Sequence, residues 1–170
     1  MEELSSNIFN SVFVHRFKDS HDHVRALCVR RLGDWLTADP ARLFKDEYVK
    51  YAGWATFDHN GAVRRQAVRS LAKLLHVDGD DDDEQAKSLA SFFMRFLERM
   101  IEVAVGDIDP AIALDMLRVL RRMQTLGMLN EMPDDLLDRI DEVIFDADAA
   151  LEVRPDVLSR PRSRSYVGPI

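Results

Sequence analysis

Apolar residues recur at three- and four-residue steps along most of the chain, which is the spacing that places side chains on one face of an α-helix. Three such stripes stand out in the sequence: Val24, Leu27, Cys28, Leu32 and Trp35; Val63, Ala67, Leu71 and Leu74; Ile112, Met116, Leu120 and Met123. No convincing stretch alternates apolar and polar residues as a half-buried strand does. The pattern therefore predicts an all-α fold.

Breaker residues divide this helical pattern into seven segments. Proline, glycine and asparagine fall between the segments, and an acidic run over 78–83 separates two of them. The helices are expected over residues 7–17, 21–37, 41–56, 61–76, 84–105, 110–126 and 134–147.

A short motif returns at long intervals. Residues 19–25, DSHDHVR, and 58–64, DHNGAVR, share the pattern Asp-x-x-x-x-Val-Arg, and related copies start at Asp107 and Asp148. The four aspartates are 39, 49 and 41 residues apart, which is about the length of a helix pair in HEAT or armadillo repeats. This spacing favours an α-solenoid of about three helix pairs, although a generic helical bundle would show the same apolar stripes.

The motif has a physical meaning if it lies at the turn between two helices. The aspartate would accept hydrogen bonds from the free N–H groups that open the next helix, and the valine would begin the buried stripe. The arginine that follows Val24 or Val63 points about 100° away from that stripe. We therefore expect its guanidinium to reach a carboxylate of the adjacent unit.

The composition is that of one ordinary domain. The chain has 170 residues, of which 46% are hydrophobic and 31% charged, and it contains no run of eighteen apolar residues. Its N-terminus is neither basic nor followed by an apolar segment, and Cys28 is its only cysteine. We expect an intracellular protein with no membrane span, secretory signal or disulfide.

The charge is unevenly distributed. Residues 1–76 carry 12 Lys and Arg against 9 Asp and Glu, whereas residues 77–148 carry 7 against 19. This acidic body argues against strong nonspecific DNA binding by the whole chain, since phosphate contact requires an excess of cations on one face. Within the more basic half, one predicted helix carries Arg64, Arg65, Arg69 and Lys73. These four side chains form either a weak DNA contact or a solvated charged face.

The sequence offers no residues for catalysis. It contains no phosphate-binding loop, dinucleotide-binding glycine pattern or nucleophile elbow. His15, His21, His23 and Cys28 lack the paired spacing of a zinc site, and the acidic run lacks the ligand alternation of a calcium loop. We therefore expect no enzyme activity, cofactor, metal or small-molecule substrate.

Several phrases together resemble a known family. They are FVHRFKD at 13–19, the run from Val24 to Trp35, Y-x-K-Y-x-G-W at 48–54 and FFMRFLERM at 92–100. These phrases closely resemble the stromalin conservative domain, the signature segment of the HEAT-repeat subunit of cohesin, and the resemblance covers residues 5 to about 125. It implies a right-handed superhelical stack of HEAT repeats. We place this domain at 5–150 and an irregular tail at 151–170.

The resemblance also implies a function. Stromalins bind the kleisin subunit of cohesin and, through it, the SMC heterodimer, and they are required for sister-chromatid cohesion and chromatin association. They are not enzymes, and they act in the nucleus on chromosomes. The matching segment forms, with the kleisin, a docking groove for short Phe/Tyr-x-Phe peptides of cohesin regulators.

Five positions match the family's groove: Phe17, Asp46, Lys50, Trp54 and Arg95. Phe17 and Trp54 precede two of the motif aspartates, so stacked repeats would bring them together as walls around an inserted ring. Arg95 would lie over a ligand ring or pair with its acidic residues, and Lys50 would flank the same surface. Asp46 would accept a ligand backbone or basic group.

The same residues also fit a purely structural role. The aromatic stripe over 48–54 has the spacing of a buried helix face, and Arg95 lies among apolar residues over which its stem can extend. Two positions depart from the family, because Phe17 replaces a common tyrosine and Lys18 a common arginine. These changes affect affinity and peptide preference without removing the groove.

The last segment does not continue the helical pattern. The fourth motif copy is followed at once by Pro155, and the remaining residues carry two more prolines and no apolar stripe. We expect this tail to be extended or disordered, with Ser159 to Ser165 as a possible modification or transport signal. Family members are several times longer, so the chain is a fragment, a truncated paralogue or an incomplete gene model. Two alternatives to peptide docking stay open: a DNA-contacting chromatin module that uses the basic N-terminal half, and a structural fragment without a ligand of its own.

Overall fold

The part of the chain described by the computed structural model consists of helices and the turns that connect them, and it contains no strand. The description covers residues 7–76, 83–130, 137–138, 140–142 and 145. The elements are a π-helical turn η1 (Phe9–Phe13), α2 (Val14–Arg16), α3 (Asp22–Ala38), α4 (Pro40–Leu43), α5 (Asp46–Trp54), a 3-10 turn η2 (Ala55–Phe57), α6 (Gly61–Leu74), α7 (Asp83–Gly106) and α8 (Pro110–Thr125). The prediction of an all-α fold is confirmed.

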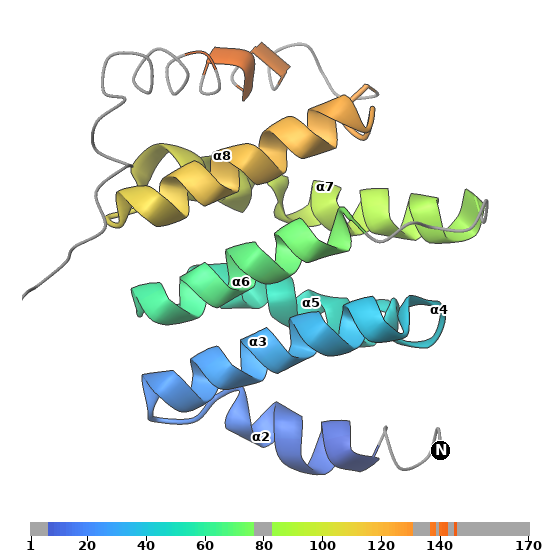
Figure 1. Ribbon diagram of the computed structural model, residues 1–170, viewed down its shortest axis with the longest axis vertical. Coiled ribbons are helices and arrows are strands. Elements are labelled where there is room, and N and C mark those ends of the chain that lie inside the picture. The colour runs from blue at the N-terminus through green and yellow to red at the C-terminus, as the bar shows by residue number, and fades with distance from the viewer. Residues whose placement is uncertain (1–6, 77–82, 131–136, 139, 143–144, 146–170) are drawn as a thin grey trace, which may run out of the picture.

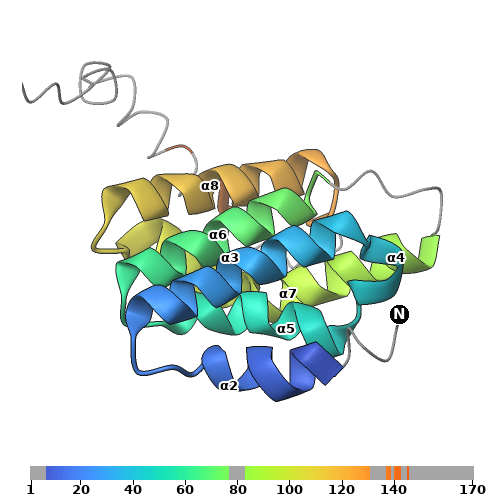
Figure 2. The same cartoon turned by 60° about the horizontal axis from the view of Figure 1, so that its bottom comes forward.

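The helices form two layers. One layer contains α3, α6 and α8 side by side, and the other contains α2, α5 and α7 (Figures 1 and 2). Each helix of the second layer is followed in sequence by a helix of the first, and the pairs stack one beside the next. Residues about forty positions apart therefore occupy equivalent places in neighbouring pairs, as a helical repeat requires.

Two of the three apolar stripes form the core as expected. The residues predicted on α6 and α8 are fully buried: Val63, Ala67, Leu71, Leu74, Ile112, Met116, Leu120 and Met123. The stripe predicted for α3 was largely wrong, because Leu27 is 51% exposed and Trp35 is 38% exposed. Among the predicted residues of that stripe, only Leu32 is buried.

The buried face of α3 is set by its smallest residue. A Cβ atom added at Gly33 would lie 2.3 Å from Oγ of Ser70 on α6, so the missing side chain permits the close approach of these two helices. The face around Gly33 therefore turns inward and brings Val29 and Leu36 into the core, together with Arg25. Leu27 and Trp35 are rotated towards solvent as a result.

Two expected helices are interrupted. The segment expected over 41–56 divides into α4 and α5, with Phe44 and Lys45 between them in non-helical conformations. This break lets the Phe44 side chain enter the core before α5 starts in a new direction. The segment expected over 7–17 begins with the wider turn η1, which holds Phe9 and Phe13 in the core with ring centroids 4.6 Å apart.

The last predicted helix and the tail are described only in part. The described residues of 134–147 are helical, and Ile140 is fully buried. The fourth motif copy at Asp148, the domain boundary at 150 and the tail 151–170 lie outside the described residues. Within the described part, no helix combines the length and the apolar content needed to cross a membrane.

Candidate functional site

One end of α5 carries a partly exposed aromatic cluster. The Tyr51 ring stands edge-on to both Phe17, at 5.0 Å between centroids, and Trp54, at 5.3 Å. Nζ of Lys50 lies 5.5 Å from the Trp54 ring and 5.6 Å from that of Tyr51, which is within cation–π range. The Trp54 side chain is nevertheless 47% exposed, so the cluster supports the indole without covering it.

Close packing against α7 fixes this end of α5. A Cβ atom added at Gly53 would lie 2.4 Å from the Phe96 ring of α7. The ring therefore rests directly on the α5 backbone next to Trp54, and only glycine leaves room for it. Gly53 occupies the side of α5 that faces α7, so the indole of the next residue, Trp54, lies on the outer side of α5.

The other end of α5 is charged. Asp46 lies in the first turn of α5 and forms an ion pair with Arg95 of α7. A hydrogen bond from Arg95 lowers the pKa of Asp46 below its usual value. The two side chains border a shallow groove of about 420 Å³, which is also lined by Val49, Ser88 and Ser91.

The five predicted groove residues therefore lie on one layer but in two groups. Asp46, Lys50 and Trp54 follow one another at four-residue steps, so Asp46 and Trp54 are about 12 Å apart along α5. Phe17 joins the Trp54 end through Tyr51, whereas Arg95 joins the Asp46 end. All five are at least partly exposed, and their role in binding stays a prediction.

Two further residues extend the aromatic end. Phe57 follows Trp54 by three positions, is 57% exposed and has the Arg99 guanidinium over its ring at 4.7 Å. Nη2 of Arg99 also donates a hydrogen bond of 2.9 Å to the Thr56 carbonyl oxygen. The sequence contained one signal for this extension, because an aromatic residue three positions after Trp54 falls on the same helical side.

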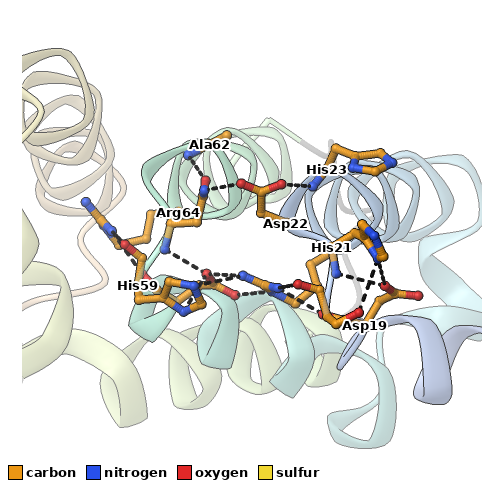
Figure 3. A network of polar contacts seen from close by, with 11 residues as sticks. Asp19, His21, Asp22, His23, His59, Ala62 and Arg64 are labelled. Atoms are coloured by element: carbon orange, nitrogen blue, oxygen red, sulfur yellow. Dashed lines mark hydrogen bonds and ion pairs between the residues drawn. The ribbon is translucent and has the colours of Figure 1, made fainter.

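Arginine–aspartate pairs join the repeats at the turn that follows Trp54 and Phe57 and at the equivalent turn of the next repeat. Nε and Nη2 of Arg25 donate hydrogen bonds of 2.7 and 2.9 Å to the Asp58 carboxylate, and those of Arg64 donate bonds of 2.7 and 2.8 Å to Asp107. Figure 3 shows the polar network beside these pairs, from Asp19 and His21 to His59 and Arg64. Nη1 of each arginine donates to backbone carbonyl oxygens of its own turn, Asp19 for Arg25 and Asp58 for Arg64, both at 2.9 Å. The expected reach of the motif arginine to the next repeat is confirmed. We call these two pairs the ladder.

The motif aspartates have a different local role from the one expected. Oδ1 accepts a hydrogen bond from the N–H two residues on, at 2.9 Å in Asp19, 2.8 Å in Asp58 and 2.9 Å in Asp107. These bonds fold the turn that precedes the helix. The helix N-caps of α6 and α8 are Asn60 and Asp109, two positions later, so the prediction that the motif aspartate caps the helix was wrong by two residues.

The four cations proposed for DNA contact do not share one free face. Arg64 is buried in the ladder, Arg65 pairs with Asp109 at 2.5 Å, and Lys73 pairs with Asp34 at 2.5 Å. Arg69 is exposed, and its side chain forms no hydrogen bond or ion pair with another described residue. DNA contact by α6 stays a prediction, and Arg64 cannot contribute to it without breaking the ladder.

Comparison with known proteins identifies the family to which this segment belongs. The family model of the Stromalin conservative domain matches residues 18–97, which include Tyr51 and Trp54 of the aromatic cluster but not Phe17, together with the Asp46–Arg95 pair and the Arg25–Asp58 pair of the ladder. The chain carries a stromalin conservative domain. Within the residues that the structure describes, no group of His, Cys, Asp and Glu is arranged to hold a metal ion.

Relatives of this stromalin domain are much longer proteins. The chain is 32% identical to "Sister-chromatid cohesion protein 3" of Arabidopsis thaliana over 86% of its own length and 12% of that protein. It is 33% identical to "Cohesin subunit psc3" of Schizosaccharomyces pombe over 73% of its length, again 12% of that protein. The chain therefore spans about an eighth of the length of these curated relatives.

A solved structure shares the fold. The "Cohesin subunit Scc3 from Z. rouxii" matches 92% of this chain and 19% of that chain, with a TM-score of 0.68 and 22% identity. Together with the stacked helix pairs, this match confirms the HEAT-repeat solenoid and removes the alternative of a closed helical bundle.

Proposed function

We propose that this stromalin domain is a non-enzymatic module of a cohesin subunit that acts in sister-chromatid cohesion on nuclear chromosomes. The named relatives are a sister-chromatid cohesion protein and cohesin subunits, which supports this assignment. The partners would be a kleisin and, through it, the SMC heterodimer. The α5 surface would dock Phe/Tyr-x-Phe peptides of cohesin regulators.

The exposed Trp54 indole is the observation that carries the docking proposal. An indole 47% exposed on a soluble domain is costly in water, and here Tyr51 and Lys50 hold it in one orientation. Aromatic side chains fixed before binding lose little conformational freedom when a ligand ring packs on them. Such anchors supply most of the energy of small peptide interfaces.

The length of the surface fits a short extended peptide. The aromatic and charged ends of α5 are about 12 Å apart, a distance that three to four extended residues cover at ~3.4 Å each. A ring at one end of the peptide would pack on Trp54, and polar or charged groups further along would meet Lys50 and the Asp46–Arg95 pair. Because Asp46 and Arg95 already neutralise each other, we expect the aromatic end to dominate affinity.

The two tryptophans provide a direct test. Trp35→Phe leaves Trp54 as the only indole, so its fluorescence reports on the α5 surface during titration with a Phe-x-Phe peptide, with and without a kleisin fragment. We expect a saturable change in emission. Trp54→Ala should weaken binding by about 2 kcal/mol or more, measured by calorimetry.

Trp35→Ala is the matched control, because Trp35 is also partly exposed but lies on α3. It should leave peptide affinity unchanged. Equal peptide affinity for wild type and Trp54→Ala, in the presence of the kleisin fragment, would remove the α5 surface from the proposed function.

A further inference from the structure

A second groove lies on the opposite layer, between α6 and α8. Its volume is about 430 Å³, which lies within the range of ligand-binding clefts. Its base is formed by apolar side chains of both helices, Val68, Ala72 and Leu75 from α6 and its C-cap and Val119 from α8. Ala72 is only partly buried, so the smallest side chain of the base lies at the opening of the groove.

The rim of this groove is basic. Arg69, Lys73 and His76 stand on the α6 side, and Arg118 and Arg122 stand on the α8 side. The sole acidic residue in the lining is Asp115, which pairs with Arg118 at 2.8 Å. Within an acidic chain of formal charge −7, this concentration of cations around an apolar base is a local reversal of the overall charge.

Two of the rim arginines, Arg69 and Arg122, form no ion pair with another described residue. The Nε atom of Arg122 is buried and has no hydrogen-bond partner among the described residues. The side chain of Arg69, which is exposed, likewise forms no hydrogen bond or ion pair with another described residue. A ligand carboxylate that reaches either guanidinium would form a charge-assisted hydrogen bond without first displacing a carboxylate of the protein.

We propose that this groove binds an acidic amphipathic helix of a protein partner. Apolar side chains at i, i+3 and i+4 of that helix would enter the groove over Ala72, and flanking carboxylates would pair with Arg69 and Arg122. The residues that line the groove come from α6 and α8, and these helices lie in the layer opposite α5 (Figure 2). The proposal does not depend on the proposed peptide docking.

An apolar base distinguishes this partner from nucleic acid. DNA phosphates need only cations, and their binding gains nothing from Val68, Leu75 or Val119 beneath the arginines. An amphipathic helix uses both features of the groove at once. The observed combination of apolar base and basic rim therefore favours an acidic helix, and duplex DNA becomes the competing outcome of the test.

The test uses the full chain and three fluorescent probes. One is a peptide of about 16 residues made of Leu and Glu with Leu at i, i+3, i+4 and i+7. The second has the same composition with its leucines scattered around the helix, and the third is a duplex DNA. Fluorescence anisotropy gives the affinity of each probe for wild type, Arg69→Glu, Ala72→Leu and Arg30→Glu.

We expect the patterned peptide to bind saturably and better than the scattered one. Arg69→Glu should weaken it about tenfold, because reversal removes one attraction and adds one repulsion. Ala72→Leu fills the opening without changing charge, so it should weaken the patterned peptide and leave DNA unaffected. Arg30→Glu is the matched control, since Arg30 is exposed on α3 and does not line the groove.

Three results would overturn the proposal. They are equal binding of the two peptides, no effect of either Arg69→Glu or Ala72→Leu, and DNA binding tighter than peptide binding with equal losses in Arg69→Glu and Arg30→Glu. Arg69 is exposed, so its variant is expected to fold even if Ala72→Leu disturbs packing. Circular dichroism of each variant checks this.

Discussion

Adjacent residues of one type have different roles in this domain. Arg64 and Arg65 both pair with an aspartate of the next repeat, but the Arg64 side chain is 10% exposed and that of Asp107 is 2% exposed. The corresponding values for Arg65 and Asp109 are 37% and 38%. From the sequence alone, Arg64 and Arg65 were both candidates for DNA contact. Charge and helical position do not reveal which carboxylate lies opposite each arginine.

Removing each arginine in turn should expose this difference. Arg64→Met leaves the Asp107 carboxylate buried without its partner, which should lower the free energy of unfolding by about 3 kcal/mol. Arg65→Met breaks a pair that is open to solvent and should cost less than about 1 kcal/mol. Urea denaturation of the two variants measures the contrast, and a loss below about 1 kcal/mol in Arg64→Met as well would show that this pair of the ladder does not stabilise the stack.

Glycine residues determine how helices pack in this fold as much as apolar stripes do. The spacing of apolar residues predicted the buried faces of α6 and α8 correctly, since each of these helices has one continuous stripe. It failed on α3, where Gly33 and not the largest side chains determines the inward face. The break at Phe44 was also missed, because no proline or glycine marks it and only the core needs it.

Gly53 provides the corresponding test for α5 and α7. Gly53→Ala places a methyl group against the Phe96 ring, and we expect a loss of about 2 kcal/mol in the free energy of unfolding despite the higher helix propensity of alanine. Gly106→Ala is the control, because a Cβ atom there meets nothing within 4 Å. Urea denaturation of both variants measures the difference.

A second substitution shows whether the Phe96 contact is the cause. Phe96→Leu creates space beside Gly53, so Gly53→Ala should cost less in that background than in wild type. Identical costs in the two backgrounds would mean that the contact between α5 and α7 does not position the Trp54 end of the candidate site.

At the scale of the whole molecule, two layers present two kinds of surface. The exposed Trp54 belongs to the layer of α2, α5 and α7, and the basic groove is lined by residues of α6 and α8 in the other layer. The recurrence of Asp-x-x-x-x-Val-Arg allowed the stack and its ladder to be predicted from sequence. The basic groove could not be predicted, because its rim comes from helices whose separation depends on packing.

The ladder also links the stability of the stack to pH. Hydrogen bonds from Arg64 lower the pKa of Asp107 below its ordinary value. Burial alone would raise the pKa of Asp58, but hydrogen bonds from Arg25 and from the Asn60 N–H outweigh it, and the net direction is also down. Near pH 4 the unfolded chain therefore binds more protons at these two positions than the folded domain does.

Stability should consequently be retained above pH ~4 and be lost as the pH falls below it towards the lowered values of the folded state. Asp107→Asn removes one of the two titrating groups, so it should be less stable than wild type at pH 7 and lose less further stability on acidification. Urea midpoints measured between pH 7 and pH 3 give both slopes. An acid slope in Asp107→Asn as steep as that of wild type would assign the acid sensitivity to carboxylates outside the ladder, and the repeats would then be held together mainly by the apolar contacts between α3, α6 and α8.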